Sequence, residues 1–247
     1  MPFAETATGA RLYYDDVGQG EVVVVLHGRL GTARDQLGSV MDWLSKTYRV
    51  IGPTLRGYGQ SEPKPRRFPP DFYARDAADI LALLDTLRIE KAHLLGYSDG
   101  GEVALIAAGQ QPGRFRSAAV WGAVGYFGPE MRPYVQRSYP PTWISAHDCE
   151  QHGISDPQVF ALEWINAMKS MIDRGGDVSL SLAPKIVCPL LLMLGAEDKL
   201  NPEAYGRKLV AAAPRGKLKM FACGHAVHEE RWPEFQKTLG AFLRGAR

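Results

Sequence analysis

Short apolar runs alternate along this chain with segments whose apolar residues recur at helical spacing. Residues 22–26 are four valines and a leucine in succession, and such an uninterrupted run predicts a strand buried on both faces. Repeated alternation of this kind predicts a parallel sheet with helices on both faces. Residues 11–17 and the turn Gly18-Gln19-Gly20 instead predict antiparallel strands at the start of the sheet. The other predicted strands are 48–52, 92–97, 117–122, 189–195 and 217–222, and the predicted helices are 33–46, 71–88, 102–110, 203–213 and 233–244.

One long segment breaks this alternation. Residues 127–185 are at first rich in proline and then show a helical pattern from 158 to 172. An ordinary connection is far shorter than these 59 residues, so we expect an insertion with a structure of its own. The predicted domains are a core formed by residues 1–126 and 186–247 and an inserted helical segment formed by residues 127–185.

The composition excludes several classes of protein. The net charge of +2 is too small for nucleic acid or an anionic membrane to be the main partner. No run approaches the roughly 18 apolar residues of a membrane span, and no basic segment followed by an apolar one marks a secretory signal. The three cysteines, Cys149, Cys188 and Cys223, form no C-x-x-C pair. We therefore expect a soluble, cytoplasmic, reduced protein.

A serine turn is the strongest chemical signal. Gly96-Tyr97-Ser98-Asp99-Gly100 fits G-x-S-x-G and lies between a predicted strand and a predicted helix, as that motif requires. Such a tight turn strains the backbone and projects the serine hydroxyl. The glycines let neighbouring chain segments approach closely. The N–H of Asp99 and the positive end of the helix dipole then point towards the same spot. The pattern predicts that Ser98 is a nucleophile.

A serine nucleophile needs a base, and six histidines are available. His225 follows the last predicted strand and precedes the last predicted helix, which places it at the same sheet edge as Ser98. His228, three residues further on, is the alternative base. His93 lies within a predicted strand and is interpreted as a core residue. His27 directly follows a strand and is interpreted as part of the scaffold of an oxyanion loop.

The base in turn needs a carboxylate that holds its tautomer. Asp198 lies just past the predicted strand that ends at Gly195, and Glu197 is the competing acid. The G-x-x-D spacing favours Asp198. The chain order Ser98, Asp198, His225 is the order of the triad in one hydrolase fold.

Several motifs together identify a family. They are His27-Gly28-Arg29, the segment 56–61 (Arg-Gly-Tyr-Gly-Gln-Ser), the serine turn, Asp198, and Gly224-His225. With these, the sequence resembles the α/β-hydrolase superfamily over essentially its whole length. It departs from many relatives in having Thr54 where they have aspartate, a position that is usually structural.

The resemblance implies a mostly parallel, eight-stranded sheet flanked by helices, with a helical cap inserted between strands six and seven. Residues 127–185 fall at that place. It also implies an oxyanion hole formed by the backbone amides of Arg29 and Asp99, with Leu30 as an alternative donor. The expected chemistry needs no cofactor and no metal.

Asp99 is the most informative residue for the substrate. A serine followed by an acid is similar to the biphenyl-hydrolase-like branch, which includes valacyclovir hydrolase, and there this aspartate binds the α-amino group of an amino-acid ester. A carboxylate beside the nucleophile could pair with such an ammonium group, although its charge opposes a developing oxyanion. Alternatively, Asp99 caps the helix or pairs with an arginine. The net charge of −2 on residues 127–185 suits a cationic substrate.

Pocket walls are expected from the cap and from the loops beside the serine turn. Binding pockets are lined mostly by apolar and aromatic side chains. The candidates for contact with substrate, besides Asp99, are Leu30, Tyr97, Tyr126, Trp143 and Trp164.

Two further clusters are interpreted without a functional role. Residues 147–152 (His-Asp-Cys-Glu-Gln-His) match no zinc spacing and are interpreted as polar cap surface. The pair Arg66-Arg67, in a proline-rich stretch, is interpreted as part of an exposed loop.

The sequence thus predicts a serine hydrolase that cleaves small carboxylic esters through an acyl-enzyme intermediate, with α-amino-acid esters as first choice. A general carboxylesterase or a lactonase is the alternative on the same scaffold, and peroxide-dependent perhydrolysis is a further activity of the same residues. A non-catalytic ligand-binding protein is the alternative of another class. Nothing in binding alone requires serine, histidine and aspartate together.

Overall fold

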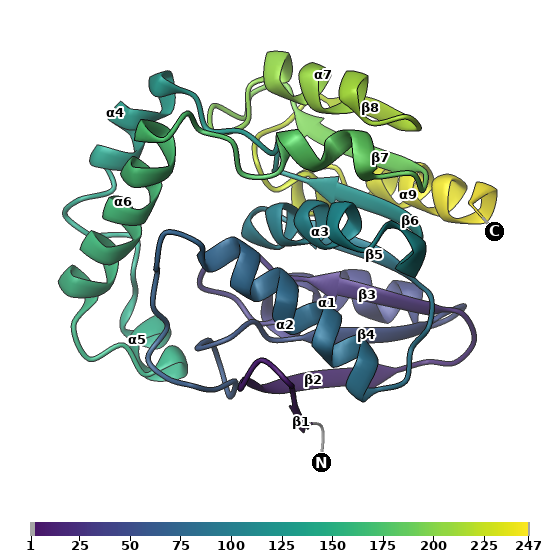
Figure 1. Cartoon of the computed structure of the whole chain (residues 1–247), viewed down its shortest axis with the longest axis horizontal. Helices are drawn as coiled ribbons and strands as arrows, with labels where there is room; N and C mark the ends of the chain where they lie inside the picture. The colour runs from purple at the N-terminus through teal and green to yellow at the C-terminus, as the bar shows by residue number, and fades with distance from the viewer. Residues whose placement is uncertain (1–2, 247) are drawn as a thin grey trace.

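Eight strands form one sheet in the computed structural model, which describes residues 3–246 (Figure 1). The strands are β1 (Phe3–Glu5), β2 (Arg11–Val17), β3 (Val22–Leu26), β4 (Arg49–Pro53), β5 (Ala92–Tyr97), β6 (Phe115–Trp121), β7 (Leu190–Gly195) and β8 (Gly216–Phe221). Their order in the sheet is β1-β2-β4-β3-β5-β6-β7-β8. The β1–β2 and β2–β4 pairs are antiparallel and the others are parallel. The predicted mostly parallel sheet with an antiparallel start is confirmed.

Helices cover both faces of this sheet. One face carries α2 (Phe72–Thr86), α3 (Asp99–Gln110) with the 3₁₀ turn η1 (Pro112–Arg114) after it, and α7 (Glu203–Ala212). The other carries α1 (Ala33–Leu44), α8 (Val227–Glu230) and α9 (Trp232–Gly245).

β3 shows why its apolar run is uninterrupted. Successive side chains of a strand point to opposite faces of the sheet. Val24 and Leu26 pack in the core on the α2–α3 face, whereas Val23 and Val25 pack in the core on the α1–α9 face.

α3 begins at Asp99, three residues before the predicted helix start at Glu102. The two glycines that follow Asp99 have the lowest helix propensity apart from proline, which is why the pattern did not reveal the first turn. Because β5 ends at Tyr97, Ser98 alone separates the strand from the helix.

The insertion between β6 and β7 is helical, as predicted. It contains α4 (Arg132–Gln136), α5 (Ala146–His152) and α6 (Pro157–Asp173), between the 3₁₀ turns η2 (Pro129–Met131) and η3 (Leu180–Lys185). In Figure 1 the three helices stand together at the left, to one side of the sheet. Asp156 caps α6 by accepting hydrogen bonds from the amides of Gln158 (2.8 Å) and Val159 (3.1 Å).

A buried carboxylate ties both ends of this insertion to the core. Glu102 of α3 accepts hydrogen bonds from the amides of Val124 (3.0 Å) and Gly125 (2.9 Å), where the chain leaves the core. It also accepts a hydrogen bond from the hydroxyl of Ser179 (3.3 Å), where the chain returns. Burial raises the pKa of Glu102 to about 7, although the bonds from the amides and the hydroxyl act against this shift.

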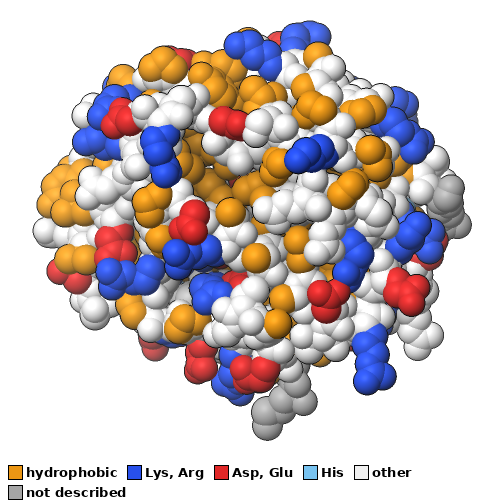
Figure 2. Space-filling view, in the orientation of Figure 1, with side chains coloured by type: hydrophobic (Ala, Val, Ile, Leu, Met, Phe, Trp, Pro, Cys, Tyr) orange, Lys and Arg blue, Asp and Glu red, His pale blue; other side chains and the backbone are white. Residues whose placement is uncertain are grey.

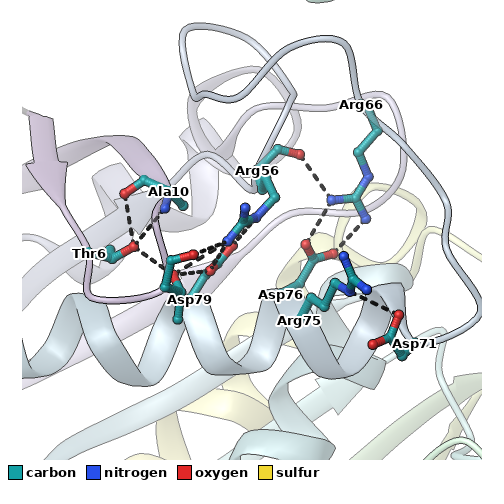
Figure 3. A network of polar contacts seen from close by, with 9 residues as sticks. Thr6, Ala10, Arg56, Arg66, Asp71, Arg75, Asp76 and Asp79 are labelled. Carbon is teal, nitrogen blue, oxygen red and sulfur yellow. Dashed lines mark hydrogen bonds and ion pairs between the residues drawn. The ribbon is translucent and has the colours of Figure 1, made fainter.

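The interpretation of Arg66-Arg67 as an exposed loop is correct for Arg67 and wrong for Arg66. Arg67 is exposed and pairs with Glu163 of α6 at 2.9 Å. The Arg66 side chain is only 3% exposed and forms a two-pronged ion pair with Asp76 of α2, at 2.7 and 2.6 Å (Figure 3). It also donates to the carbonyl of Arg56 and lies 5.0 Å from the ring of Tyr58. Its partners come from other segments, so the local sequence did not reveal its burial.

The interpretation of residues 147–152 as polar surface is wrong at its last residue. His152 is buried, and its Nδ1 accepts a hydrogen bond from the Gly59 amide at 2.9 Å. It therefore joins α5 to the core. In the described part of the chain, no three His, Cys, Asp or Glu side chains are grouped so that they could hold a metal ion. Within residues 3–246, no helix is both long and apolar enough to cross a membrane.

We predict that Asp76→Asn lowers the free energy of unfolding by about 3–5 kcal/mol, because it leaves the buried Arg66 guanidinium without its counter-charge. The matched control is Asp71→Asn, which breaks the exposed Arg75–Asp71 pair on the same helix (Figure 3) and should cost less than about 1 kcal/mol. Urea denaturation measures both. Equal, small effects would mean that Arg66 is solvated.

We also predict that Glu102 makes the protein less stable as the pH rises. Its folded-state pKa of about 7 lies above its ordinary value of 4.5, so the folded state holds the proton more tightly than the unfolded state. Glu102 therefore contributes about 3 kcal/mol to the free energy of unfolding below pH 4.5. This contribution is lost as the pH rises through 7.

Urea denaturation between pH 5 and 8 tests this dependence. The decline should be shallower in Glu102→Gln, whereas Glu90→Gln, at an exposed glutamate, should follow the unmodified protein. If Glu102→Gln keeps the full decline, another group is responsible.

Candidate active site

The turn between β5 and α3 holds Ser98 in a strained backbone conformation. Its φ is +52° and its ψ is −120°, a region that residues other than glycine rarely adopt. The turn closes this tightly because a side chain at Gly96 would collide with the backbone of Gly100. A side chain at Gly100 would collide with the backbone of Leu26 at the end of β3. The hydroxyl of Ser98 therefore projects beyond the edge of the sheet.

His225 and Asp198 reach this hydroxyl from the ends of β8 and β7. Because β5 to β8 are neighbouring parallel strands, their carboxyl ends meet at one edge. His225 Nε2 lies 3.0 Å from Ser98 Oγ, and His225 Nδ1 lies 2.7 Å from Asp198 Oδ2. Gly122, at the end of β6, is needed here, since a Cβ on it would lie 2.8 Å from His225 Cε1.

Asp198 is buried but well supplied with hydrogen bonds. Its Oδ1 accepts from the Leu200 amide (2.9 Å) and its Oδ2 from the side chain of Asn201 (2.9 Å). Burial acts to raise the pKa of Asp198, but the bonds from His225, Asn201 and Leu200 outweigh it, and the pKa lies below its usual value. An ionised carboxylate so placed can hold the His225 ring and stabilise its protonated form.

The two alternative residues are not placed to act on Ser98. Glu197 is exposed. Both ring nitrogens of His228 are already used, because Nδ1 accepts from Trp121 Nε1 (3.0 Å) and Nε2 donates to the carbonyl of Gln36 (3.2 Å). Burial lowers the pKa of His228 to about 4, so its ring is neutral.

His27 orients the loop that follows β3. Its Nε2 accepts a hydrogen bond from the Leu55 amide (2.9 Å), so its Nδ1 carries the proton and donates to the carbonyl of Gly28 (2.7 Å). Burial lowers the pKa of His27 to about 3, which keeps the ring neutral. A peptide group is planar and trans, so the Arg29 N–H points away from the carbonyl that His27 holds.

Gln36, on the first turn of α1, clamps the same loop and was not predicted from the sequence. Its Oε1 accepts from the Gly28 amide (2.8 Å), and its Nε2 donates to the carbonyl of Arg29 (3.1 Å). The Arg29 carbonyl shares a peptide group with the N–H of Leu30, whose φ is +53°. A glutamine near the start of a helix has the same sequence pattern whether it is solvated or buried. The sequence therefore gave no indication that Gln36 contacts this loop.

A cavity of about 520 Å³ opens beside Ser98 and His225. Figure 2 shows a hollow between α4–α6 and the core, with hydrophobic side chains within it and charges of both signs around it. Of the predicted contact residues, Tyr97, Asp99, Trp143 and Trp164 line the cavity. Arg29, predicted for the oxyanion hole, lines it as well.

The other two predicted contact residues, Leu30 and Tyr126, lie outside the described lining of this cavity. Leu30 packs against the hydrophobic core. The ring of Tyr126 packs edge-on against Tyr205 of α7, with ring centroids 4.8 Å apart. The structure therefore places these two side chains in apolar packing rather than on the wall of the cavity.

Asp99 faces the cavity with one oxygen bound and one free. Tyr73 donates to its Oδ1 at 2.7 Å. Burial, together with the charges of Asp99 and Glu102, raises the pKa of Tyr73, so its hydroxyl remains a donor. The Oδ2 of Asp99 is buried, and no described residue donates a hydrogen bond to it or pairs with it.

Comparison with known proteins agrees with this architecture. A family model described as alpha/beta hydrolase fold matches residues 21–143. Serine hydrolase BPHL of Homo sapiens is 30% identical over 244 residues, which cover 96% of this chain and 84% of that protein. Non-heme chloroperoxidase CPO-A1 of Kitasatospora aureofaciens is 38% identical, with 98% and 99% covered.

A solved structure gives the same result. The enol-lactonase from Burkholderia xenovorans LB400 superposes with a TM-score of 0.75 at 25% identity and covers 98% of this chain and 100% of its own. Taken with the serine turn and the strand order, these similarities show that the chain belongs to the α/β-hydrolase family.

Proposed function

We propose that this hydrolase cleaves small carboxylic esters, with Ser98 as nucleophile, His225 as base and Asp198 as the residue that orients the base. The observation that carries the proposal is the continuous hydrogen-bonded row from Ser98 Oγ through His225 to Asp198, at 3.0 and 2.7 Å. A serine hydroxyl is a weak nucleophile unless such a base accepts its proton.

The proposed reaction has two halves. His225 accepts the proton of Ser98 as Oγ attacks the ester carbonyl, and it then gives this proton to the departing alcohol. The acid part stays bound to Ser98 as an acyl-enzyme. His225 next accepts a proton from water, which attacks the acyl carbonyl, and returns the proton to Ser98 as the acid leaves.

The proposed oxyanion hole is formed by the backbone amides of Arg29 and Asp99. Asp99 is the first residue of α3, so its N–H has no partner within the helix and lies at the positive end of the dipole. His27 fixes the direction of the Arg29 N–H through the Gly28 carbonyl. Leu30 remains the alternative donor, and Gln36 would orient its N–H through the Arg29 carbonyl.

Residues 127–185 are proposed to act as the cap of this site, over the core formed by residues 1–126 and 186–247. The cavity volume of about 520 Å³ suits a small molecule. A small-molecule substrate and a reduced, cytoplasmic setting complete the proposal. The free thiols of Cys149, Cys188 and Cys223 are compatible with it.

α-Amino-acid esters are the proposed substrate class. Asp99 lines the same cavity as Ser98, its neighbour in the chain, and its buried Oδ2 has no hydrogen-bond donor among the described residues. A buried carboxylate oxygen without a donor is costly, and a substrate ammonium would supply the missing donor. The likeness to an enol-lactonase favours a lactonase as the second candidate.

We predict that Ser98→Ala lowers kcat by about 10⁴-fold or more, as removal of a triad serine does elsewhere. It should also abolish labelling by a fluorophosphonate probe, measured by mass spectrometry. Ser39→Ala, at an exposed serine of α1, is the control and should keep both activity and labelling. Near-normal turnover in Ser98→Ala would refute the assignment, and folded protein that takes up no label would instead favour a ligand-binding protein.

We predict that Asp99→Asn removes a preference for aminoacyl esters. A p-nitrophenyl α-aminoacyl ester and its deaminated twin are compared by kcat/KM. The unmodified protein should prefer the amino ester roughly 10- to 100-fold, as expected for a charge-assisted hydrogen bond, and the variant should lose this ratio. If the two esters are equally good and the ratio does not change, Asp99 is structural.

A further inference from the structure

The side chain of Arg29 has a role separate from that of its backbone. The loop after β3 is pressed against the nucleophile, since a Cβ on Gly28 would lie 3.1 Å from the Cβ of Ser98. Gln36 fixes the Arg29 carbonyl. The Arg29 side chain therefore starts at the residue after Gly28, which lies against Ser98, and it lines the cavity.

Two tryptophans of the insertion hold the guanidinium group. The Cζ atom of Arg29 lies 3.8 Å from the ring centroid of Trp164 and 4.2 Å from that of Trp143. These two rings are themselves in edge-to-face contact, with centroids 6.0 Å apart. Stacking on an aromatic face stabilises the charge and fixes the plane of the group, but it leaves the N–H donors at its edge unused.

One buried donor of Arg29 has no acceptor within residues 3–246. Its Nη1 is buried and without a hydrogen bond, and among the described residues no carboxylate pairs with it. Arg56 and Arg66 differ from Arg29 in this respect. Arg56 pairs with the carboxylate of Asp79, and Arg66 pairs with that of Asp76. A buried donor without an acceptor is costly, so a ligand acceptor there would be favourable.

The cavity is thus lined by two residues of opposite charge that form no ion pair with each other in the described structure. Asp99 offers an acceptor without a donor, and Arg29 offers a donor without an acceptor. A second arginine, Arg137 at the end of α4, also lines the cavity. The net charge of residues 127–185, which suits a cationic substrate, therefore does not describe the cavity itself.

From these contacts we infer that the Arg29 side chain binds a carboxylate of the substrate, so that the ester taken by this site carries an ammonium group and a carboxylate together. This inference rests on the proposed function and adds the second charged group. The flat fork of a guanidinium matches the two oxygens of a carboxylate. An arginine that only docked the insertion onto the core would not distinguish anionic from neutral esters.

Two isosteric pairs of esters test the inference. The first pair is the α-methyl esters of L-glutamate and L-glutamine, which place the carboxylate or its amide on the acid part. The second pair is 4-carboxyphenyl and 4-carbamoylphenyl L-alaninate, which place it on the alcohol part. The readout is the ratio of kcat/KM within each pair, because any common loss cancels in it.

The unmodified protein should prefer the anionic member of at least one pair roughly 10- to 100-fold. Arg29→Met keeps an unbranched apolar side chain against the two indoles but has no guanidinium group. It should therefore abolish the preference for the anionic ester. Arg29→Lys keeps the charge without the fork and should retain part of the ratio. No preference in either pair, or a ratio that survives in Arg29→Met, overturns the inference.

A binding measurement separates this inference from the proposed function. Ser98→Ala cannot form the acyl-enzyme, so equilibrium dialysis with the same esters reports binding alone. Tighter binding of an anionic ester, lost when Arg29→Met is added, supports the carboxylate site even if the unmodified protein cleaves none of these esters. Equal binding of both members of both pairs overturns it, even if ester cleavage at Ser98 is established.

Discussion

Close backbone contact around the serine turn is the constraint on which the site depends. Ser98 keeps a left-handed φ because glycines at 96 and 100 let β5, the start of α3 and the end of β3 approach more closely than any side chain would allow. The same approach brings Gly28 against Ser98 and so places the loop after β3 beside the serine turn. Ser98, the amide at the start of α3 and the Arg29 amide are thus positioned by one packing arrangement.

That arrangement extends outward through neutral, buried polar groups. His27 and His228 both have pKa values lowered by burial, and each uses both ring nitrogens in hydrogen bonds. His27 holds the loop directly, and His228 holds the backbone of Gln36, whose side chain clamps the loop. A group that does not titrate near neutral pH keeps its geometry across that range, which suits residues that orient donors.

The sequence predicted the parts of the site that are local in the chain. Ser98, Asp198 and His225 each follow a strand at the same edge, and strand periodicity together with the turn motif locates them. The partners of Gln36, Glu102 and Asn201 could not be predicted in this way. They lie in segments brought together only by folding, and a polar side chain on a helix or loop has the same local pattern whether it is solvated or buried. Arg66 and His152 were misinterpreted for the same reason.

The two residues proposed to supply the oxyanion amides also carry the opposite charges of the cavity. A carboxylate at Asp99 opposes the negative charge that develops on the carbonyl oxygen, so it is tolerated best when a cation neutralises it. A substrate ammonium would do so at Asp99, while the Arg29 guanidinium adds positive charge on the other donor. Because each backbone position fixes both an amide and a side chain, the geometry proposed to stabilise the oxyanion would also fix where the charged groups of the substrate lie. Selection of the substrate and stabilisation of its transition state would then depend on the same two loops.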